Sequence, residues 1–271
     1  MERYAAVNAS SAGALFCTLL PQVERGFAFL AYASDGLVYN DPLSPNRTYG
    51  FTDTVAKQGR LLVSSLLVMQ AHDALSRWAA ATGCGNATHH ADSAARIRAA
   101  VPAVFYDRAS GYFLACDQGP NALPDIWGSA LAVHLNATTS EAQARRIVDN
   151  FAASEASLFQ QGQLRHLPAG VFWGKCFFGC PRRGTYQNGA FWGTPLAWVA
   201  PVLVRYGQAP MALRQLSAAA ASFASGGVME CINANISYHG AEQYVDTATN
   251  AYAGWALTFG RDAALSGASG S

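Results

Sequence analysis

Two kinds of helix-length segment alternate along the chain, and they differ in how their hydrophobic residues are arranged. One kind is apolar around nearly its whole circumference, as in 61–69 and 126–135. Helices of this composition are buried on most sides. The other kind carries one apolar stripe at helical spacing, as in 90–105 and 140–158. These helices are expected to bury one face and to expose the other to water.

The order of these segments predicts an all-α protein of stacked helical hairpins. The segments are striped 11–33, buried 52–81, striped 90–106, buried 125–136, striped 140–159, buried 188–206, striped 209–225 and buried 246–260. An inner ring of buried helices inside an outer ring of striped ones satisfies this order with short connections. We expect one α/α toroid domain over 1–271, with a flexible tail at 261–271. An irregular α bundle and an α-solenoid are the alternatives.

Polar and aromatic residues precede each buried segment. These short stretches are 49–53, 123–127, 186–189 and 244–247. If the inner helices are parallel, all four stretches converge on one mouth, where a concave ligand site would form. The connections 34–50, 107–122 and 160–187 are rich in Gly, Pro, Tyr and Phe and have weak helical periodicity, so they predict short β-hairpins.

Charge and hydropathy exclude several classes of partner. The formal net charge is +1 and no basic run is present, which argues against nucleic acid as the partner. No stretch reaches the roughly 20 apolar residues that span a bilayer. The apolar set from Leu15 to Leu30 continues at helical spacing, which predicts a helix of the fold and not a signal peptide. His89 and His90 form a poor metal cluster, and we expect neither a metal nor a cofactor.

Sequons and cysteines predict a secretory or extracellular glycoprotein. Five Asn-X-Ser/Thr sequons, several in predicted loops, begin at Asn8, Asn46, Asn86, Asn136 and Asn235. The chain has six cysteines, of which Cys176 and Cys180 flank Phe-Phe-Gly in a predicted loop. These two cysteines form either a local disulfide or two free thiols. A zinc site is not expected, because no second Cys/His pair has the spacing of zinc ligands.

The predicted mouth is rich in Asp, Glu, Trp, Tyr and Asn and has no Ser or Cys nucleophile motif. Aromatic faces cover the C–H surfaces of sugars, and glycosidic cleavage uses two carboxyl groups. The composition of the mouth therefore indicates carbohydrate chemistry.

Four segments resemble motifs of the six-hairpin glycosidases, the superfamily that includes trehalases, processing α-glucosidases and glycogen-debranching domains. The segments are 49–57, 125–130, 184–193 and 244–250. The most specific is Tyr-Gln-Asn-Gly-x-x-Trp at 186–192, although the superfamily's element is one residue shorter and its trehalase branch has Trp-Asp where Tyr186-Gln187 stands here. The resemblance implies an (α/α)6 barrel of twelve helices. Since about eight are counted, we expect an incomplete barrel.

The resemblance also implies hydrolysis of an α-linked glycoside by an acid and a base, commonly with inversion. By motif position Asp53 resembles the acid and Glu230 the base, with Asp125 and Glu242 in reserve. Asp53 and Asp125 also have a structural interpretation, because each precedes a helix where Asp is a favoured cap. Glu230 has no helix-cap motif around it.

Further residues of the mouth are candidates for holding the sugar rings of an oligosaccharide or glycoside substrate. These are Asp125, Trp127, Trp173, Lys175, Tyr186, Asn188 and Trp192. The tryptophans could instead pack in the core, and the Tyr and Asn could tie the loop to the next helix. Two other functions stay open. One is a non-catalytic carbohydrate-binding protein or truncated pseudo-enzyme on the same fold, and the other is a lyase or epimerase with His166, Tyr238 or His239 as base.

Overall fold

The computed structural model describes residues 9–44 and 54–260. The helices in these ranges are α2 (Ala9–Ala28), α3 (Leu62–Thr82), α4 (Ala87–Phe105), α5 (Ile126–His134), α6 (Glu141–Ala153), α7 (Glu155–Leu158), α8 (Leu196–Arg205), α9 (Ala209–Gly226) and α10 (Val245–Phe259). Each predicted segment contains a helix, and the single-turn α7 follows α6 directly. The prediction of an all-α chain of helical hairpins is confirmed.

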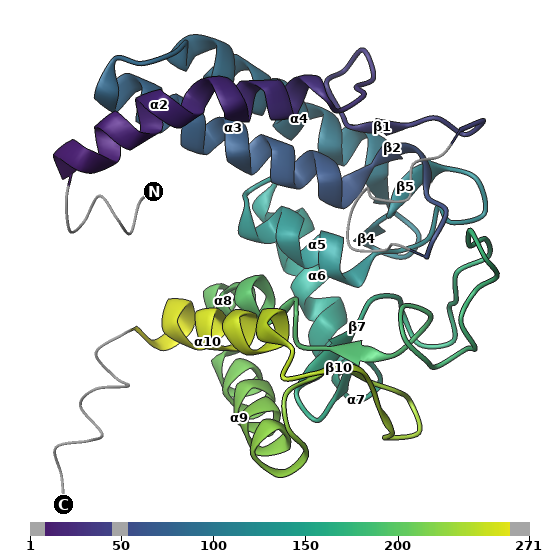
Figure 1. Cartoon of the computed structure of the whole chain (residues 1–271). Helices are drawn as coiled ribbons and strands as arrows, with labels where there is room; N and C mark the ends of the chain where they lie inside the picture. The colour runs from purple at the N-terminus through teal and green to yellow at the C-terminus, as the bar shows by residue number, and fades with distance from the viewer. Residues whose placement is uncertain (1–8, 45–53, 261–271) are drawn as a thin grey trace, which may run out of the picture.

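The helices form two layers that curve into an open arc (Figure 1). In the inner layer α3 contacts α5, α5 contacts α8, and α8 contacts α10. In the outer layer α4 packs on α3, α6 on α5, and α9 on α8. Helices α2 and α3 lie at one end of the arc and α10 at the other (Figure 1). This is the predicted toroid, and it is incomplete.

Burial follows the position of each helix in the arc. All residues of α5 from Ile126 to Val133 are buried, as expected for a central inner helix. The stripe of α6 is buried on one side through Ala144, Ile147, Val148 and Phe151. Helix α10 was predicted to be buried on most sides, and this is wrong, because only Thr247 and Gly254 are buried. It lies at the end of the arc, where its main inner-layer neighbour is α8.

Short strands occupy the connections. One sheet has the order β1 (Tyr39–Asn40), β2 (Gln58–Leu61) and β5 (Cys116–Gln118), and a separate hairpin pairs β3 (Tyr106–Asp107) with β4 (Tyr112–Phe113). The largest sheet is antiparallel, in the order β10 (Tyr238–Glu242), β9 (Met229–Ile232), β8 (Phe191–Trp192), β7 (Gln163–Arg165) and β6 (Phe159–Gln160). Hairpins β3–β4 and β6–β7 lie at the predicted regions 107–122 and 160–187, whereas β1 pairs outside its predicted region, with β2. The β9–β10 hairpin was not predicted.

Two inner helices begin later than predicted. In the segment expected to be helical from residue 52, the described part from Thr54 to Leu61 is not helical, because Gly59 has φ +76 and β2 pairs with β5. The segment expected to be helical from residue 188 begins only at Leu196, after Gly189 at φ +113 and strand β8. Glycine adopts positive φ without steric cost, so each glycine permits the chain to leave the helical path.

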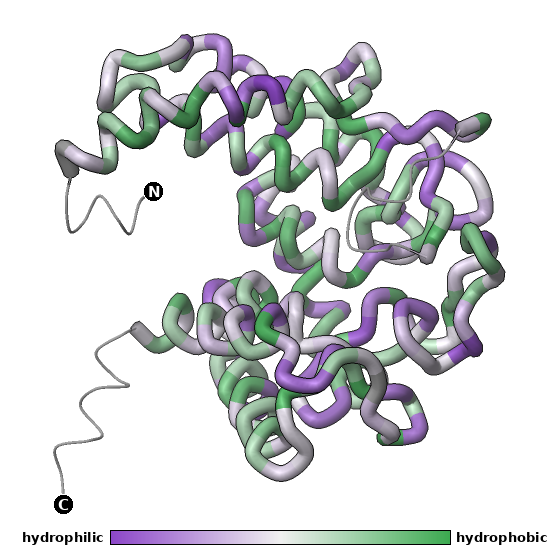
Figure 2. Tube along the Cα trace, viewed as in Figure 1, coloured by the Kyte–Doolittle hydropathy of each residue, from purple (hydrophilic) through white to green (hydrophobic). Residues whose placement is uncertain are grey.

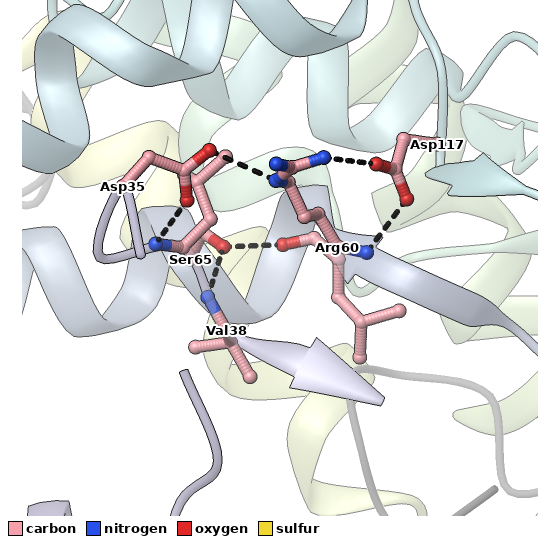
Figure 3. A network of polar contacts seen from close by, with 7 residues as sticks. Asp35, Val38, Arg60, Ser65 and Asp117 are labelled. Atoms are coloured by element: carbon pink, nitrogen blue, oxygen red, sulfur yellow. Dashed lines mark hydrogen bonds and ion pairs between the residues drawn. The ribbon is translucent and has the colours of Figure 1, made fainter. Parts of the chain in front are cut away.

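An ion-pair network fastens the loop after α2 to the two neighbouring strands (Figure 3). Arg60 on β2 binds Asp35 through Nε at 2.8 Å and Asp117 through Nη1 at 2.7 Å. Ser65 Oγ accepts a hydrogen bond from Val38 N at 2.9 Å and donates one to the Leu61 carbonyl at 2.6 Å. The network fixes the register of β1 against β2 beside the start of α3.

The apolar core follows the inner layer, and hydrophobic positions recur along its helices (Figure 2). Two disulfides reinforce the fold. Cys176–Cys180 is the local bridge considered from the sequence, and Cys17–Cys84 joins α2 to the turn after α3. In the described part of the chain, no helix combines the length and apolarity needed to cross a bilayer.

Candidate functional site

Three of the four polar stretches, 123–127, 186–189 and 244–247, lie in the described residues and share one face of the arc, whereas 49–53 lies outside them. Thr54 donates hydrogen bonds to Gln187 Oε1 from its N at 3.1 Å and from its Oγ1 at 2.6 Å. The N-terminus of α5 meets the loop after β7 through Ile126 N and the His166 carbonyl. Thr194, before α8, donates to Asp246 on α10 at 2.5 Å. The N-terminal ends of the inner helices therefore converge on one region, as predicted.

Asp125 is the most deeply buried acidic group of this region. It is 0% exposed, and its Oδ1 caps α5 by accepting a hydrogen bond from Gly128 N at 2.7 Å. The same oxygen lies 3.1 Å from His166 Nε2, while Oδ2 has no hydrogen-bond partner in the described residues. Burial opposes the charge of Asp125, but His166, Lys57 and the Gly128 N–H together lower its pKa. Asp125 is thus an ionised group with a structural role as a cap.

Lys57 completes this buried polar cluster, and it was not among the residues predicted for the site. Its side chain is 3% exposed, and its Nζ lies over the ring of Trp173 at 5.4 Å from the centroid. Burial lowers the pKa of Lys57, partly offset by the charge of Asp125. The available signal was a lysine beside the apolar pair Val55-Ala56, in a segment that was otherwise interpreted as the start of a helix.

The three candidate tryptophans belong to one continuous aromatic cluster. His166 stacks on Trp127 at 4.5 Å with an interplanar angle of 1°, and Trp173 meets His166 edge-on at 5.3 Å. Trp192 contacts Trp127 at 6.1 Å and Tyr186 at 5.3 Å. Trp127, Trp173 and Trp192 are all buried. In the described residues their rings therefore contact protein, and they form the base on which the loops rest.

Asn188 ties the loop before β8 to its surroundings. Its Oδ1 accepts a hydrogen bond from Trp173 N at 2.9 Å, and its Nδ2 donates to the Pro181 carbonyl at 2.7 Å. The side chain of Lys175 is exposed, but its carbonyl accepts hydrogen bonds from Ala56 N and Asn121 Nδ2. Both contacts hold loops together, as one of the two interpretations of Asn188 anticipated.

Glu230 is a partly exposed carboxylate that is held on both oxygens. Oε1 accepts a hydrogen bond from Tyr186 Oη at 3.3 Å, and Oε2 accepts one from Ala241 N at 3.1 Å. Gly240 lies against the carboxylate, because a Cβ there would be 2.0 Å from Oε2. Tyr186 itself has φ +43, a conformation that costs energy in a non-glycine residue and that clusters at functional sites. Glu242, the reserve base, is exposed.

Comparison with known proteins gives matches among solved structures only, since neither a protein-family model nor a curated protein matches the chain. The GH63 mannosylglycerate hydrolase of Thermus thermophilus, solved with glucose, aligns at TM-score 0.56 and 18% identity, covering 73% of this chain and 47% of that one. Neutral trehalase from Saccharomyces cerevisiae aligns at 0.53 and 12%, covering 77% and 40%. The fold is that of the six-hairpin glycosidases. The chain spans about half the length of these structures.

The arc of the described residues corresponds to part of the ring in these structures, of which the chain covers 47% and 40%. The convergent loops occupy one face of this toroid. Asp53, the predicted acid, lies outside the described residues. Its sequence neighbour Thr54 is anchored on Gln187, next to Tyr186, the residue that holds Glu230.

A histidine cluster, separate from the candidate site, lies between α2, α3 and α4. His72 Nδ1 and His90 Nδ1 are 2.9 Å apart, and His90 Nε2 is 3.7 Å from Glu24 on α2. Burial, together with neighbouring His90, His89 and Arg96, lowers the pKa of His72 to about 4. Within 9–44 and 54–260, no three Asp, Glu, His or Cys side chains are placed to hold a metal ion.

Proposed function

We propose that this chain belongs to a glycoside hydrolase that cleaves an α-linked glycoside, with Glu230 as the base and Asp53 as the acid. Asp53 donates its proton to the glycosidic oxygen as the bond to the anomeric carbon breaks. Glu230 accepts a proton from the water whose oxygen attacks that carbon from the opposite face. The outcome is inversion, for which the two carboxyl groups stand roughly 6.5–9.5 Å apart to admit the water.

One observation carries this proposal. Two hydrogen bonds connect the segment next to Asp53 with Glu230. Thr54 donates to Gln187, and the preceding residue, Tyr186, donates to Glu230. Gln187, which binds Thr54, and Tyr186, which binds Glu230, are neighbours in the chain, although Thr54 and Gln187 are 133 positions apart. This arrangement supports the proposal that Asp53 and Glu230 act on one bond, as an acid and a base must.

The setting of Glu230 supports its role as the base. Both carboxylate oxygens accept hydrogen bonds, which fixes the orientation of the group while its partial exposure leaves it open to water. The buried cluster of Trp127, Trp173 and Trp192 lies behind it and gives the loops a rigid support. In this proposal Tyr186 and Lys175 contact the sugar from the rim, whereas Asp125 and Asn188 hold the frame.

We further propose that the protein is a secreted or lumenal glycoprotein. The two disulfides are of the kind that persists in oxidising compartments. Of the five sequons, three fall in the described residues, and Asn86, Asn136 and Asn235 are all exposed. Asn8 and Asn46 lie outside the described ranges.

The test is hydrolysis of three α-linked substrates, namely an aryl α-glucoside, trehalose and mannosylglycerate, by the wild type, Glu230→Gln and Glu242→Gln. Glu242 is the matched control, because it is an exposed carboxylate on the neighbouring strand. We expect Glu230→Gln to lose about 10²–10⁴-fold in kcat while Glu242→Gln retains activity, since acid–base groups contribute that much. Equal turnover by Glu230→Gln and the wild type would remove Glu230 from the mechanism.

The stereochemical part of the proposal has its own readout. Proton NMR of the first sugar released distinguishes an inverted from a retained anomer. Binding of the same sugars without turnover by any variant would instead support the second candidate, a non-catalytic carbohydrate-binding protein.

A further inference from the structure

A long stretch of the chain around the candidate site contains no acidic residue. Between Glu155 and Glu230 the sequence has neither Asp nor Glu, although the whole chain is nearly neutral at a formal net charge of +1. The basic residues of this stretch that precede α8 are Arg165, Lys175, Arg182 and Arg183. The loops that carry them therefore give one wall of the site a positive charge, which concentrates ligands of the opposite sign.

Arg165 is buried without an acidic partner. It is 8% exposed on β7, and its guanidinium lies over the ring of Phe191 at 5.2 Å from the centroid. Nη2 donates a hydrogen bond to the Gly189 carbonyl at 3.3 Å, whereas Nε has no partner in the described part of the chain. Burial lowers the pKa of Arg165, and no charged neighbour in 9–44 or 54–260 offsets this effect. A buried charge normally has a counter-ion, because removing it from water without one is costly.

A second guanidinium group lies close by, at the surface. Arg183 is exposed, and its Cζ lies over the ring of Phe172 at 5.1 Å from the centroid. A Cβ at Gly189 would be 3.1 Å from Arg165 Nη2 and 3.2 Å from Phe172 Cε1, so the buried guanidinium and the Phe172 ring both border Gly189. Arg165 approaches Phe172 from the interior and Arg183 from the surface. Arginines placed in this way bind the paired oxygen atoms of carboxylate and phosphate groups.

The turn at 184–189 connects the two arginines to the proposed base. It is closed by a hydrogen bond from Gly184 N to the Asn188 carbonyl at 2.9 Å. Within this turn, the Gly189 carbonyl accepts from Arg165, and Tyr186 Oη donates to Glu230 at 3.3 Å. An anion at the arginines and a sugar ring at Glu230 would therefore contact the same turn.

We propose that Arg165 and Arg183 form a subsite for the anionic group of an acidic sugar, so that the substrate is a negatively charged α-glycoside. This proposal rests on the proposed hydrolase function and narrows it to one substrate class. The carboxylate or phosphate oxygens of the sugar accept hydrogen bonds from the two guanidinium groups. They also supply the counter-charge that Arg165 lacks among the described residues. Lys175 and Arg182, both exposed on the same loop, add attraction at longer range.

Titration calorimetry on the full chain tests the subsite with four probes, namely D-glucuronate, D-glucose 6-phosphate, D-glucose and inorganic phosphate. None of them contains a bond that a glycosidase cleaves, so binding is measured independently of hydrolysis. We expect one of the two anionic sugars to bind at least about tenfold more tightly than glucose and than inorganic phosphate. Which of the two binds identifies the anionic group as a carboxylate or a phosphate.

Three variants locate the binding site. Arg165→Gln and Arg183→Gln should each weaken binding of the anionic sugar by about 10- to 100-fold, the value of hydrogen bonds to a charged group, and should leave glucose binding unchanged. Arg25→Gln is the matched control, because it removes the same charge from an exposed position on α2, at one end of the arc. It should bind the anionic sugar like the wild type. Circular dichroism confirms that each variant is folded.

Stability separates recognition of a ligand from a structural role of Arg165. Because Arg165→Gln removes a buried charge without a counter-ion, its midpoint of urea unfolding should equal or exceed that of the wild type. A lower midpoint together with unchanged binding of the anionic sugar would assign Arg165 a structural role and overturn the proposal. If Arg165→Gln does not fold, the exposed Arg183→Gln decides.

The outcomes also distinguish this proposal from the hydrolase function. Loss of anionic-sugar binding in the folded arginine variants, with Arg25→Gln unaffected, supports the subsite, and if no α-glycoside is then cleaved, only the hydrolase proposal fails. Equal affinity of the wild type for glucose and for both anionic sugars overturns the subsite, even if a neutral α-glucoside is cleaved. Binding of inorganic phosphate as tight as that of the anionic sugars also overturns it and leaves a site for free anions.

Discussion

Substitution of the buried residue Asp125 tests how the candidate site is stabilised. Two contributions to the stability of the fold meet at this residue. Its Oδ1 caps α5, which contributes about 1 kcal/mol in typical helices. It also compensates the charge of Lys57, and removing one partner of a buried ion pair costs about 3–5 kcal/mol.

Two substitutions separate these contributions. Asp125→Asn keeps an oxygen that can accept from Gly128 N, so it loses only the charge, and we expect it to lower the free energy of unfolding by about 3 kcal/mol. This is the low end of the range, because Lys57 can release its proton. Asp125→Ala loses the cap as well and should cost about 1 kcal/mol more. Urea denaturation followed by tryptophan fluorescence measures both values.

The matched control is Ser140→Ala, which removes the cap of α6, whose acceptor is Ser140 Oγ at an exposed position. That change should cost only about 1 kcal/mol, since no buried charge is involved. If Asp125→Asn is no more damaging than Ser140→Ala, the interpretation of a buried ionised cluster is refuted.

The cluster also predicts a pH dependence. Because the folded-state pKa of Asp125 lies below the ordinary value of 3.8, its stabilisation is complete above that pH and is lost as the pH falls through the folded-state value. The difference in stability between the wild type and Asp125→Asn should therefore be constant near neutral pH and shrink below about pH 4. A difference that shrinks between pH 8 and pH 6 would assign the dependence to another group.

Three further predictions concern other parts of the chain. Gly240→Ala should reduce hydrolysis by at least about tenfold by displacing the Glu230 carboxylate, whereas Gly170→Ala, at similar φ but with open space around it, should leave activity intact. Because the pKa of His72 falls from 6.5 to about 4, the folded state should lose stability as the pH drops from 6.5 towards 4, and His72→Gln should flatten that slope in urea titrations. Removing the Cys17–Cys84 disulfide, which closes a 67-residue loop, should lower the unfolding free energy by about 4 kcal/mol, measured by calorimetry of the double serine variant.

Periodicity was enough to predict the helices, because burial on one face or on all faces leaves a local record in the sequence. The stripe of α6 and the uniformly apolar α5 show this directly. Where a long-range partner decides the structure, the local pattern failed. Residues 54–61 are extended because β2 pairs with β5, and α10 is exposed because it ends the arc.

The candidate site was predictable to the same extent. Motif position identified Glu230, Tyr186 and Trp192, which the fold brings together. It did not indicate that Lys57 would be buried over Trp173, since those residues are more than a hundred positions apart and meet only in three dimensions. The role of Asp53 stays a prediction, as it lies outside the described residues.

The arc in which each inner helix contacts its sequence neighbours has a consequence for motion. Local unfolding of the helices at one end of the arc should leave the other end folded, because each helix is stabilised mainly by its neighbours, as in repeat proteins. Backbone amides should then exchange with deuterated water in a gradient, slowest in α5 at the centre and fastest in α2 and α10. The convergent loops join helices all along the arc, so the half of the candidate site near α3 and α5 should be more rigid than the half near α10.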